Sequence, residues 1–242
     1  MPSISRTVSC IVPCYRYAHY LKECIDSLLA QTVKLHEIII VSDGSPDNTK
    51  EVAEDIIASH PFANIKFIEK VNGGLSSARN AGITIATGEF IMCLDADDKL
   101  VPGAIEEHLK LMVDDMTIAQ CGLMEFGERH VVMIPTKPTG LKRILMSNTI
   151  FCNAMYPRKA WVEVGGYDES EIMRLGREDH DFWVRCLAKG YTINSSDFIA
   201  LRYRVHEGQM TQATLHPNMK KLDVYFKEKY HDLYEKFDLL DY

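Results

Sequence analysis

Residues 89–100 read E-F-I-M-C-L-D-A-D-D-K-L, in which an apolar run is followed directly by a cluster of aspartates. The run 90–94 is typical of a strand that is buried on both faces of a sheet. Asp95, Asp97 and Asp98 follow it directly. Because open α/β sheets bind ligands beyond the carboxyl ends of their strands, these acids are predicted to lie at a ligand-binding edge.

Asp95 and Asp97 stand two residues apart, so an extended chain directs both side chains to the same side. Carboxylate oxygens grouped on one side suit a hard divalent cation, Mg²⁺ or Mn²⁺, held together with the phosphates of a ligand. The plainer interpretation is a solvated acidic turn that caps the next helix. Features elsewhere in the chain distinguish the cation site from the solvated turn.

The composition is that of a soluble globular chain of 242 residues, 46% hydrophobic and 25% charged. A net charge of −7 argues against a nucleic-acid partner. Residues 1–8 are too polar for a secretory signal, and no stretch approaches the length of a membrane span. The chain has no C-x-x-C pair, and most of its cysteines lie inside apolar patterns, which predicts buried thiols and a reducing, cytoplasmic setting. These predicted buried thiols are Cys10, Cys24, Cys93, Cys121 and Cys186.

Strands and helices are predicted to alternate from residue 8 to residue 94. The expected strands are 8–13, 37–41, 65–68 and 90–94, and the expected helices are 19–31, a helix that begins near Ser45, and 75–86. Ser45 is predicted to be the N-cap of the second helix, with Pro46 at its first position. This alternation is typical of a doubly wound, mostly parallel sheet flanked by helices.

Polar residues follow each of the four predicted strands. Right-handed crossovers gather these ends along one edge of the sheet, so Tyr15, Asp43, 72–74, Asp95 and Asp97 are predicted to converge. No G-x-G-x-x-G follows the first strand, and no G-x-x-x-x-G-K-[ST] occurs anywhere. A dinucleotide-binding fold and a P-loop are therefore both disfavoured.

The remainder predicts further mixed structure within one domain spanning 1–242. The expected elements are a helix after Pro102, a hairpin of 117–126 with 130–134, a helix at 141–146, a strand at 150–156, a helix at 159–164, a loop at 173–177, a helix from Glu178, a strand at 199–205, and a C-terminal helix from Asn218. We expect residues 1–100 to form a nucleotide-binding half, 101–210 an acceptor-binding half and 211–242 a helical tail. The lysine- and aromatic-bearing tail either rests on an anionic membrane surface at the inner face or packs against its own domain.

Taken together, the motifs resemble those of family 2 glycosyltransferases with the GT-A fold. They are I-V-P-C-Y at 11–15, I-I-I-V-S-D-G-S-P-D-N-T at 38–49, N-G-G-L-S-S-A-R-N-A-G-I at 72–83, G-E-F-I-M-C-L-D-A-D-D at 88–98, V-G-G-Y-D-E at 164–169 and R-E-D-H-D-F at 177–182. Their order and spacing agree with that family over roughly residues 9–206.

The resemblance implies a nucleotide-diphospho-sugar donor, by default a UDP-sugar, a divalent cation (Mn²⁺ or Mg²⁺), and direct displacement with inversion. It implies a glycan or lipid-linked acceptor, and Asp179 as the base that deprotonates the acceptor hydroxyl. The implied nucleotide-binding residues are Pro13, Tyr15, Asp43, Gly74, Arg79, Asp95 and Ala96. The implied metal ligands are Asp97, Asp95 and His206, and the implied diphosphate or acceptor contacts are Arg204 and Glu178.

Local sequence alone favours plainer roles for several of these residues. Asp43 is also a turn-former beside Gly44, and Arg79 is also an ordinary surface ion-pair partner. Asp179 also suits the N-terminus of a helix electrostatically. In the family comparison, Ser42 stands where relatives often have a first aspartate, and 14–16 replace the commoner T-Y-N.

Two other functions compete with glycosyl transfer. A sugar nucleotidyltransferase predicts a glycine-rich basic loop after the first strand, and 13–17 contains no glycine. A non-catalytic nucleotide-sugar binding module predicts a damaged E-D or D-x-D motif, and both motifs are whole. The Q-x-x-R-W motif of processive synthases is missing, so the addition of one sugar per visit is predicted.

Overall fold

A computed structural model describes residues 6–137 and 139–240. Its central sheet has the strand order β3-β2-β1-β4-β8. The strands are β1 (Val8–Cys14), β2 (Glu37–Asp43), β3 (Ile65–Lys70), β4 (Phe90–Cys93) and β8 (Tyr156–Pro157). The first four run parallel, and β8 pairs with β4 in the antiparallel direction. The prediction of a mixed, mostly parallel sheet is confirmed.

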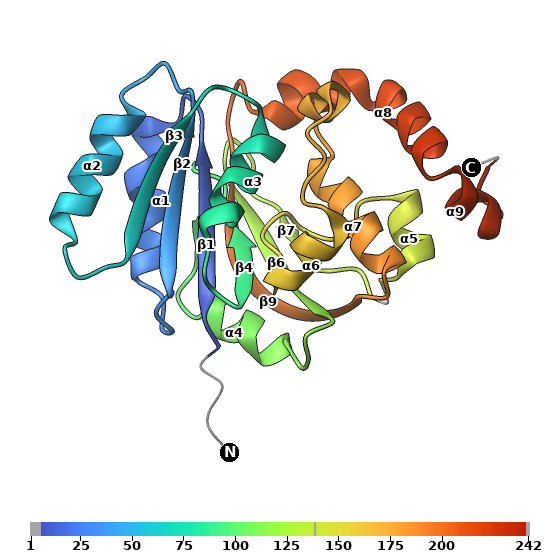
Figure 1. Cartoon of the computed structure of the whole chain (residues 1–242), viewed down its shortest axis with the longest axis horizontal. Helices are drawn as coiled ribbons and strands as arrows, with labels where there is room; N and C mark the ends of the chain where they lie inside the picture. Colours follow the sequence, from blue (N-terminus) through green and yellow to red (C-terminus); the bar gives the residue numbers. More distant parts are fainter. Residues whose placement is uncertain (1–5, 138, 241–242) are drawn as a thin grey trace.

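Helices cover both faces of this sheet (Figure 1). α1 (Ala18–Leu29) and α2 (Thr49–Ser59) lie on one face, and α3 (Leu75–Ile85) packs on the other against β1 and β2. Successive strand residues point to opposite faces, so Ile11 joins the core beneath α3 while Cys10 joins the core beneath α1. Double-sided burial explains why these strands are apolar without interruption.

A second sheet lies beside the first and has the order β5-β9-β6-β7. Its strands are β5 (Lys99–Leu100), β6 (Thr117–Gly127), β7 (Val132–Met133) and β9 (Thr192–Val205), and α4 (Ala104–Leu111) packs on β6 and β9. β6 and β7 form the predicted hairpin. β5 pairs with β9 directly after the acidic turn, which brings the late strand beside the Asp95–Asp98 segment.

The remaining helices gather beyond the second sheet. They are α5 (Leu141–Met146), α6 (Arg158–Val164), a 3₁₀ turn (Glu171–Leu175), α7 (Glu178–Ala188), a π-helical turn (Thr211–Leu215), α8 (His216–Lys229) and α9 (His231–Lys236). The predicted C-terminal helix is therefore present, and a second short helix follows it.

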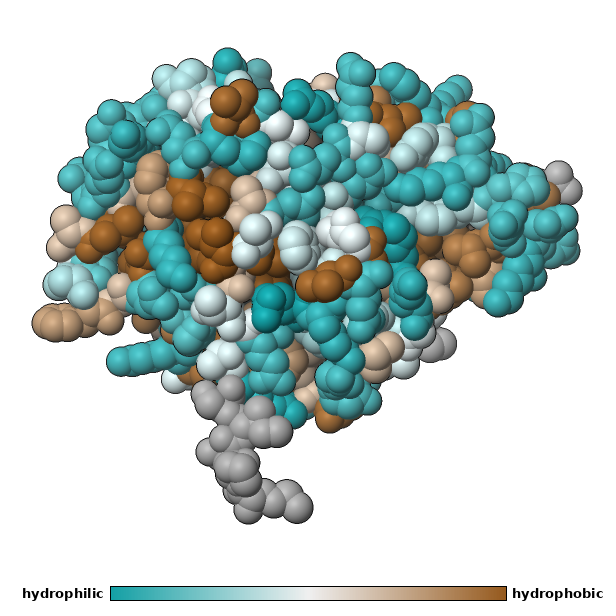
Figure 2. All heavy atoms as spheres, viewed as in Figure 1, coloured by the Kyte–Doolittle hydropathy of each residue, from teal (hydrophilic) through white to brown (hydrophobic). Residues whose placement is uncertain are grey.

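The apolar side of the tail packs against the domain. Leu222, Phe226, Tyr230 and Tyr234 belong to the same core as the buried residues of α7, while Figure 2 shows mainly hydrophilic residues along the outer side of α8. None of the helices in the described part of the chain has the length and apolar character that crossing a bilayer requires.

Two local predictions are wrong. The second helix begins at Thr49 rather than after Ser45, because Ser45 and Asp47 bond to each other and to Arg16 and Ala18 of the preceding loop. The predicted strand at 150–156 reduces to the last two residues, Tyr156–Pro157, preceded by an isolated bridge from Met155 to Ala119. The prediction for the five cysteines in apolar patterns is confirmed, since all five are buried and free.

Candidate active site

The carboxyl ends of β1, β2 and β4 open into one cavity of about 510 Å³. Predicted nucleotide-binding and metal residues among its lining are Pro13, Tyr15, Asp43, Gly74, Asp95, Ala96 and Asp97. The convergence expected from parallel strands with right-handed crossovers is therefore present. Tyr15 remains substantially exposed, with 40% of its surface accessible, and the Arg16 guanidinium lies over its ring at 5.3 Å.

Asp43 is buried at the end of β2 and holds the turn at 72–74, which follows β3. Its carboxylate accepts the backbone N–H groups of Gly73 at 2.9 Å and Gly74 at 2.8 Å, and it pairs with Lys70 Nζ at 2.9 Å. Asn72 donates its side-chain amide to the Asp43 carbonyl. Asp43 thus holds a turn 29 to 31 residues away in sequence, and this turn carries Gly74 at the wall of the cavity.

The acidic turn after β4 is buried, so the interpretation as a solvated turn is wrong. Asp97 and Asp98 are 5% and 2% exposed. Burial and the neighbouring Asp95 raise the pKa of Asp97, and burial with Asp97 and Asp95 raises the pKa of Asp98 well above its ordinary value. Carboxylates that repel one another in a dry site are stabilised by a cation.

His206 and Arg204 reach this turn from the end of β9. His206 Nε2 lies 3.0 Å from Asp97 Oδ2, and its ring packs against those of Tyr17 and Tyr20. Imidazole nitrogen and carboxylate oxygen are both ligands that Mn²⁺ accepts. The pair therefore fits the divalent cation that the motif implies, with Asp97 and His206 as its holders.

Arg204 does not line the cavity of about 510 Å³, nor does it line the larger cavity described below. Its Nε donates to the Asp97 carbonyl at 2.8 Å, its backbone N–H donates to Asp98 Oδ1 at 2.8 Å, and its guanidinium pairs with Glu23. The side chain lies over the ring of Tyr20. Arg204 therefore holds the acidic turn in place, and the structure does not bring it to the predicted diphosphate contact.

Arg79 is buried, so the interpretation as a surface ion pair is wrong. Only 1% of its side chain is exposed, and it joins two carboxylates. Nη1 donates to Glu178 Oε1 at 2.5 Å and Nη2 donates to Asp95 Oδ1 at 3.0 Å. Burial nevertheless raises the pKa of Glu178 to about 7, against the lowering effect of Arg79.

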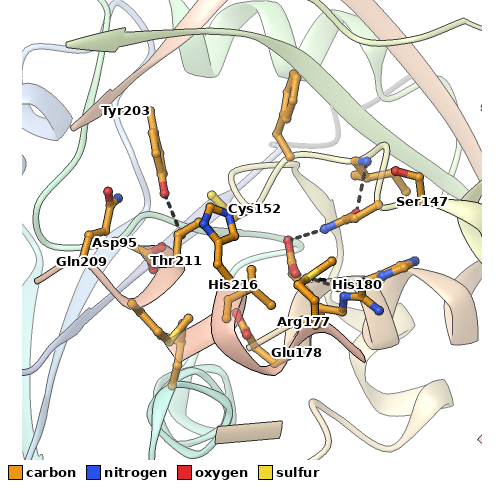
Figure 3. Close-up of a pocket in the computed structure, with 18 of the residues that line it drawn as sticks. Asp95, Ser147, Cys152, Arg177, Glu178, His180, Tyr203, Gln209, Thr211 and His216 are labelled. Carbon is orange, nitrogen blue, oxygen red and sulfur yellow. Dashed lines mark hydrogen bonds between the residues drawn. The ribbon is translucent and has the colours of Figure 1, made fainter. Parts of the chain in front are cut away.

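A second cavity of about 880 Å³ adjoins the first (Figure 3). Arg79, Asp95, Glu178 and Asp179 line it, and Asp95 also lines the first cavity. Asp179, half-buried in the first turn of α7, accepts a hydrogen bond from Asn148 Nδ2 at 3.0 Å. The two cavities thus form one cleft with Asp95 at their junction, Asp43 on the wall of the first and Asp179 on the wall of the second.

The C-terminal tail contacts α7, the helix that carries Glu178 and Asp179. Arg177, immediately before α7, pairs with Asp223 of α8 at 2.7 Å. Tyr230 donates to Asp181 Oδ1 at 2.5 Å, and Lys229 pairs with the same carboxylate. These three contacts hold the start of α7, and therefore the backbone of Glu178 and Asp179, against the tail.

Sequence reasoning missed several residues of the cleft. Gln209, Met210 and Thr211 line both cavities from the segment after β9, and His216 and Met219 line the larger one. Asn148 was also missed. Gln209, Met210 and Thr211 follow His206 in the polar loop after β9, whose resemblance to the family could have pointed to them. Asn148, His216 and Met219 belong to no recognisable motif, so the local sequence carries no signal for these three.

Comparison with known families matches these motifs. The family model described as glycosyl transferase family 2 matches residues 9–167, and the model described as N-terminal domain of galactosyltransferase matches residues 141–210. The first match spans most of the chain, including the strands that build the donor-side cavity. The second covers α7 and β9, which carry Asp179 and Arg204.

Curated relatives are also glycosyltransferases. An uncharacterized glycosyltransferase of Rickettsia typhi is 31% identical over 87% of this chain and 68% of its own length, and one of Rickettsia prowazekii is 30% identical over 96% and 72%. The chondroitin synthase of Pasteurella multocida is 43% identical over 46% of this chain. The chain matches only 11% of that synthase's length.

Solved structures share the fold at low sequence identity. S. aureus TarS 1–349 in complex with UDP-GlcNAc superposes with a TM-score of 0.73 at 18% identity, covering 96% of this chain and 73% of that one. The mannosyltransferase of Pyrobaculum calidifontis, in complex with GDP-Man and Mn²⁺, gives 0.69 at 19% identity, covering 87% and 60%. These structures share the fold, and the family match over residues 9–167 together with the Rickettsia typhi relative shows that the chain belongs to glycosyl transferase family 2.

Proposed function

We propose that this enzyme transfers one sugar per visit from a nucleotide-diphospho-sugar to a hydroxyl of a glycan or lipid-linked acceptor, with inversion and with the help of a divalent cation. One observation carries the proposal: Asp95 lies where two cavities meet, with Asp97 lining the smaller cavity and Asp179 the larger one. Donor and acceptor thus each have a cavity, and the reacting bond lies between them.

The donor occupies the smaller cavity in this proposal. The nucleotide lies against Pro13, Tyr15 and Gly74, while its diphosphate points to Asp97. A divalent cation held by Asp97 and His206 would supply positive charge beside the departing diphosphate. Asp43 contributes by holding the turn that carries Gly74, and the direct contact of Asp43 with the base remains part of the proposal.

Asp179 acts as the base in this proposal. Its carboxylate lines the larger cavity, where the acceptor hydroxyl would lie, and Asn148 orients one of its oxygens. As the acceptor oxygen attacks the anomeric carbon, Asp179 takes its proton. The attacking oxygen and the leaving group then lie on opposite faces of the sugar ring, which gives inversion.

Glu178 fits the role of base less well than Asp179 does. Its side chain is 5% exposed and is engaged by the Arg79 guanidinium at 2.5 Å. A base must reach the acceptor proton directly or through one water. We therefore propose that Glu178 shapes the site through Arg79 and that Asp179 carries the proton.

The nucleotide is proposed to be UDP. TarS binds UDP and UDP-GlcNAc, whereas the Pyrobaculum mannosyltransferase binds GDP-Man with Mn²⁺. The acceptor is assigned to the 101–210 half with the tail, because Asn148, Asp179, His216 and Met219 line the larger cavity. The seven free cysteines fit a reducing compartment such as the cytoplasm.

The first experiment measures the melting temperature with UDP, GDP and dTDP, each with and without Mn²⁺. A nucleotide at one hundred times its dissociation constant adds about 2.7 kcal/mol of stability. We expect a metal-dependent rise with UDP. If none of the three nucleotides raises the melting temperature, the donor-site proposal is wrong.

The second experiment uses Asp179→Asn. The variant should keep the UDP-dependent rise in melting temperature and lose transfer to acceptor by about 10²-fold or more. Transfer at the wild-type rate would remove Asp179 from the role of base. Anomeric configuration of the product, read by NMR, tests inversion separately.

A further inference from the structure

Three side chains from two distant segments meet at the floor of the cleft. Asp95 and Asp98 come from the turn between β4 and β5, and Cys152 comes from the irregular segment before β8. One ligand atom from each lies within 4.8 Å of the other two. Asp95 and Cys152 both line the larger cavity, where Figure 3 shows them.

Asp98 supplies an independent observation. Its residue is 2% exposed, and its Oδ2 is buried with no hydrogen-bond partner among the described residues. The other oxygen accepts the Arg204 backbone N–H at 2.8 Å. A buried carboxylate oxygen without a partner is costly, so this atom has the environment of a ligand atom that awaits a cation.

This group is distinct from the Asp97–His206 pair. Asp97 directs its Oδ2 to His206 at 3.0 Å, and neither residue belongs to the group around Cys152. Arg79 engages Asp95 through Oδ1 only. The acidic turn therefore presents two sets of donors, one of oxygen and nitrogen and one of oxygen and sulfur.

The donor set decides which cation fits. Mg²⁺ takes oxygen ligands and retains its waters, whereas Zn²⁺ and Co²⁺ accept carboxylate oxygen and thiolate sulfur together. Three protein ligands that leave one position open are typical of zinc sites exposed to a cavity. We propose that Asp95, Asp98 and Cys152 form a second cation site, for a borderline thiol-binding divalent cation such as Zn²⁺ or Co²⁺, with its open position facing the larger cavity.

Binding exchanges a proton for the metal. The Cys152 S–H bond breaks as the sulfur–metal bond forms, and the proton leaves to solvent through the open side of the cavity. No oxidation state changes. The added charge lies beside Asp95, Asp97 and Asp98, where it offsets their mutual repulsion and stabilises the folded state.

Cobalt absorbance tests the site without reference to sugar transfer. Co²⁺ added to the metal-free protein should give a sulfur-to-cobalt charge-transfer band that saturates at one ion per chain. Cys152→Ser should remove the band, whereas His206→Ala should keep it, since cobalt on Asp97 and His206 has no sulfur ligand. Cys121→Ser is the control, because that free thiol lies outside the group.

Asp98→Asn tests the remaining ligand and should weaken cobalt binding at least tenfold, with far-UV circular dichroism as the check on folding. A wild-type protein without the band, or a band that survives Cys152→Ser, overturns the site. Unchanged affinity in a folded Asp98→Asn variant overturns it equally. Failure of the donor proposal would appear as absence of the nucleotide-dependent melting shift, which this absorbance does not measure.

Discussion

Arg79 and Glu178 form a buried ion pair across 99 residues of sequence, with Nη1 2.5 Å from Oε1. The same guanidinium reaches Asp95 at 3.0 Å. One cation thus joins α3, the carboxyl end of β4 and the first turn of α7. Because Asp95 and Glu178 line the cleft from these two elements, Arg79 holds the two sides of the cleft together.

Replacing the Arg79 guanidinium should destabilise the folded protein. Arg79→Met leaves two carboxylates without their partner in a buried site, and we expect a loss of about 3–5 kcal/mol in the free energy of unfolding. Urea denaturation measures the loss. Lys22→Met is the control: it removes a surface pair between helix neighbours, Lys22 and Asp26, which should cost no more than about 1 kcal/mol. Equal losses in the two variants would contradict the bridging role.

His206 should decide the affinity for the cation. Removing one ligand with His206→Ala is expected to weaken Mn²⁺-dependent UDP binding about tenfold or more, equivalent to about 1.4 kcal/mol. Isothermal titration calorimetry with and without Mn²⁺ measures the change. His231→Ala, an exposed histidine on α9, should bind as the wild type does. If the two variants behave alike, His206 is not a ligand.

Asn148 should set the working pH range of the enzyme. Asn148→Asp places a negative charge opposite Asp179, where the amide now donates at 3.0 Å. Like charge favours the protonated form of the base, so the acidic limb of the pH–rate profile should move to higher pH. Asn148→Ala removes the hydrogen bond without adding charge and should lower kcat with a smaller movement of the limb. Superimposable profiles for all three proteins would exclude this role.

Gly82 permits α3 to lie close to the sheet. A Cβ at this position would be 2.5 Å from Ile11 Cγ2 and 3.0 Å from Val41 Cγ2. Gly82→Ala should therefore cost about 1–3 kcal/mol through overpacking, measured by thermal or urea unfolding. Gly140→Ala, where a Cβ meets nothing within 4 Å, should leave stability nearly unchanged. A neutral Gly82→Ala would mean that the helix moves away from the sheet at little cost.

Glu37 should link stability to pH. Burial alone would raise its pKa, but hydrogen bonds from Lys66, Ser9 and Thr87 outweigh burial and lower it from 4.5 to about 2. The stabilisation is complete above about pH 4.5 and is lost as the pH falls towards 2. Glu37→Gln should therefore cost about 2 kcal/mol at pH 7 and progressively less in acid. A constant difference from pH 7 to pH 2.5 would contradict the lowered pKa.

The sequence predicted the parallel half of the fold because that half depends on local signals. Runs of apolar residues such as 37–41 and 90–94 end in turn residues, and such runs fill strands buried on both faces. The convergence of Tyr15, Asp43 and Asp97 followed from chain direction alone. The identity of the acid that takes the proton came from resemblance, because no local pattern separates Asp179 from an acid that merely suits a helix N-terminus.

The failures occurred where tertiary contacts override local preference. Ser45 and Pro46 look like a helix start, but Asp47 draws Ser45 and Thr49 into a loop network instead. Residues 150–156 have strand-like composition, yet only Tyr156 and Pro157 find a partner along β4. The roles of Asn148 and Arg204 depend on neighbours 31 and more than 100 residues away, so periodicity carries no information about them.

The acidic turn depends on contacts with the end of β9 and the residue after it, which are synthesised much later than the turn itself. Asp98 accepts a hydrogen bond from the backbone N–H of Arg204, 106 residues later, and Asp97 contacts His206, 109 residues later. A nascent chain that has emerged only through β5 carries the acids without these partners, and domains assemble in the order of synthesis. Premature termination before β9 therefore yields a chain in which Asp97 and Asp98 lack the partners that hold the acidic turn in place.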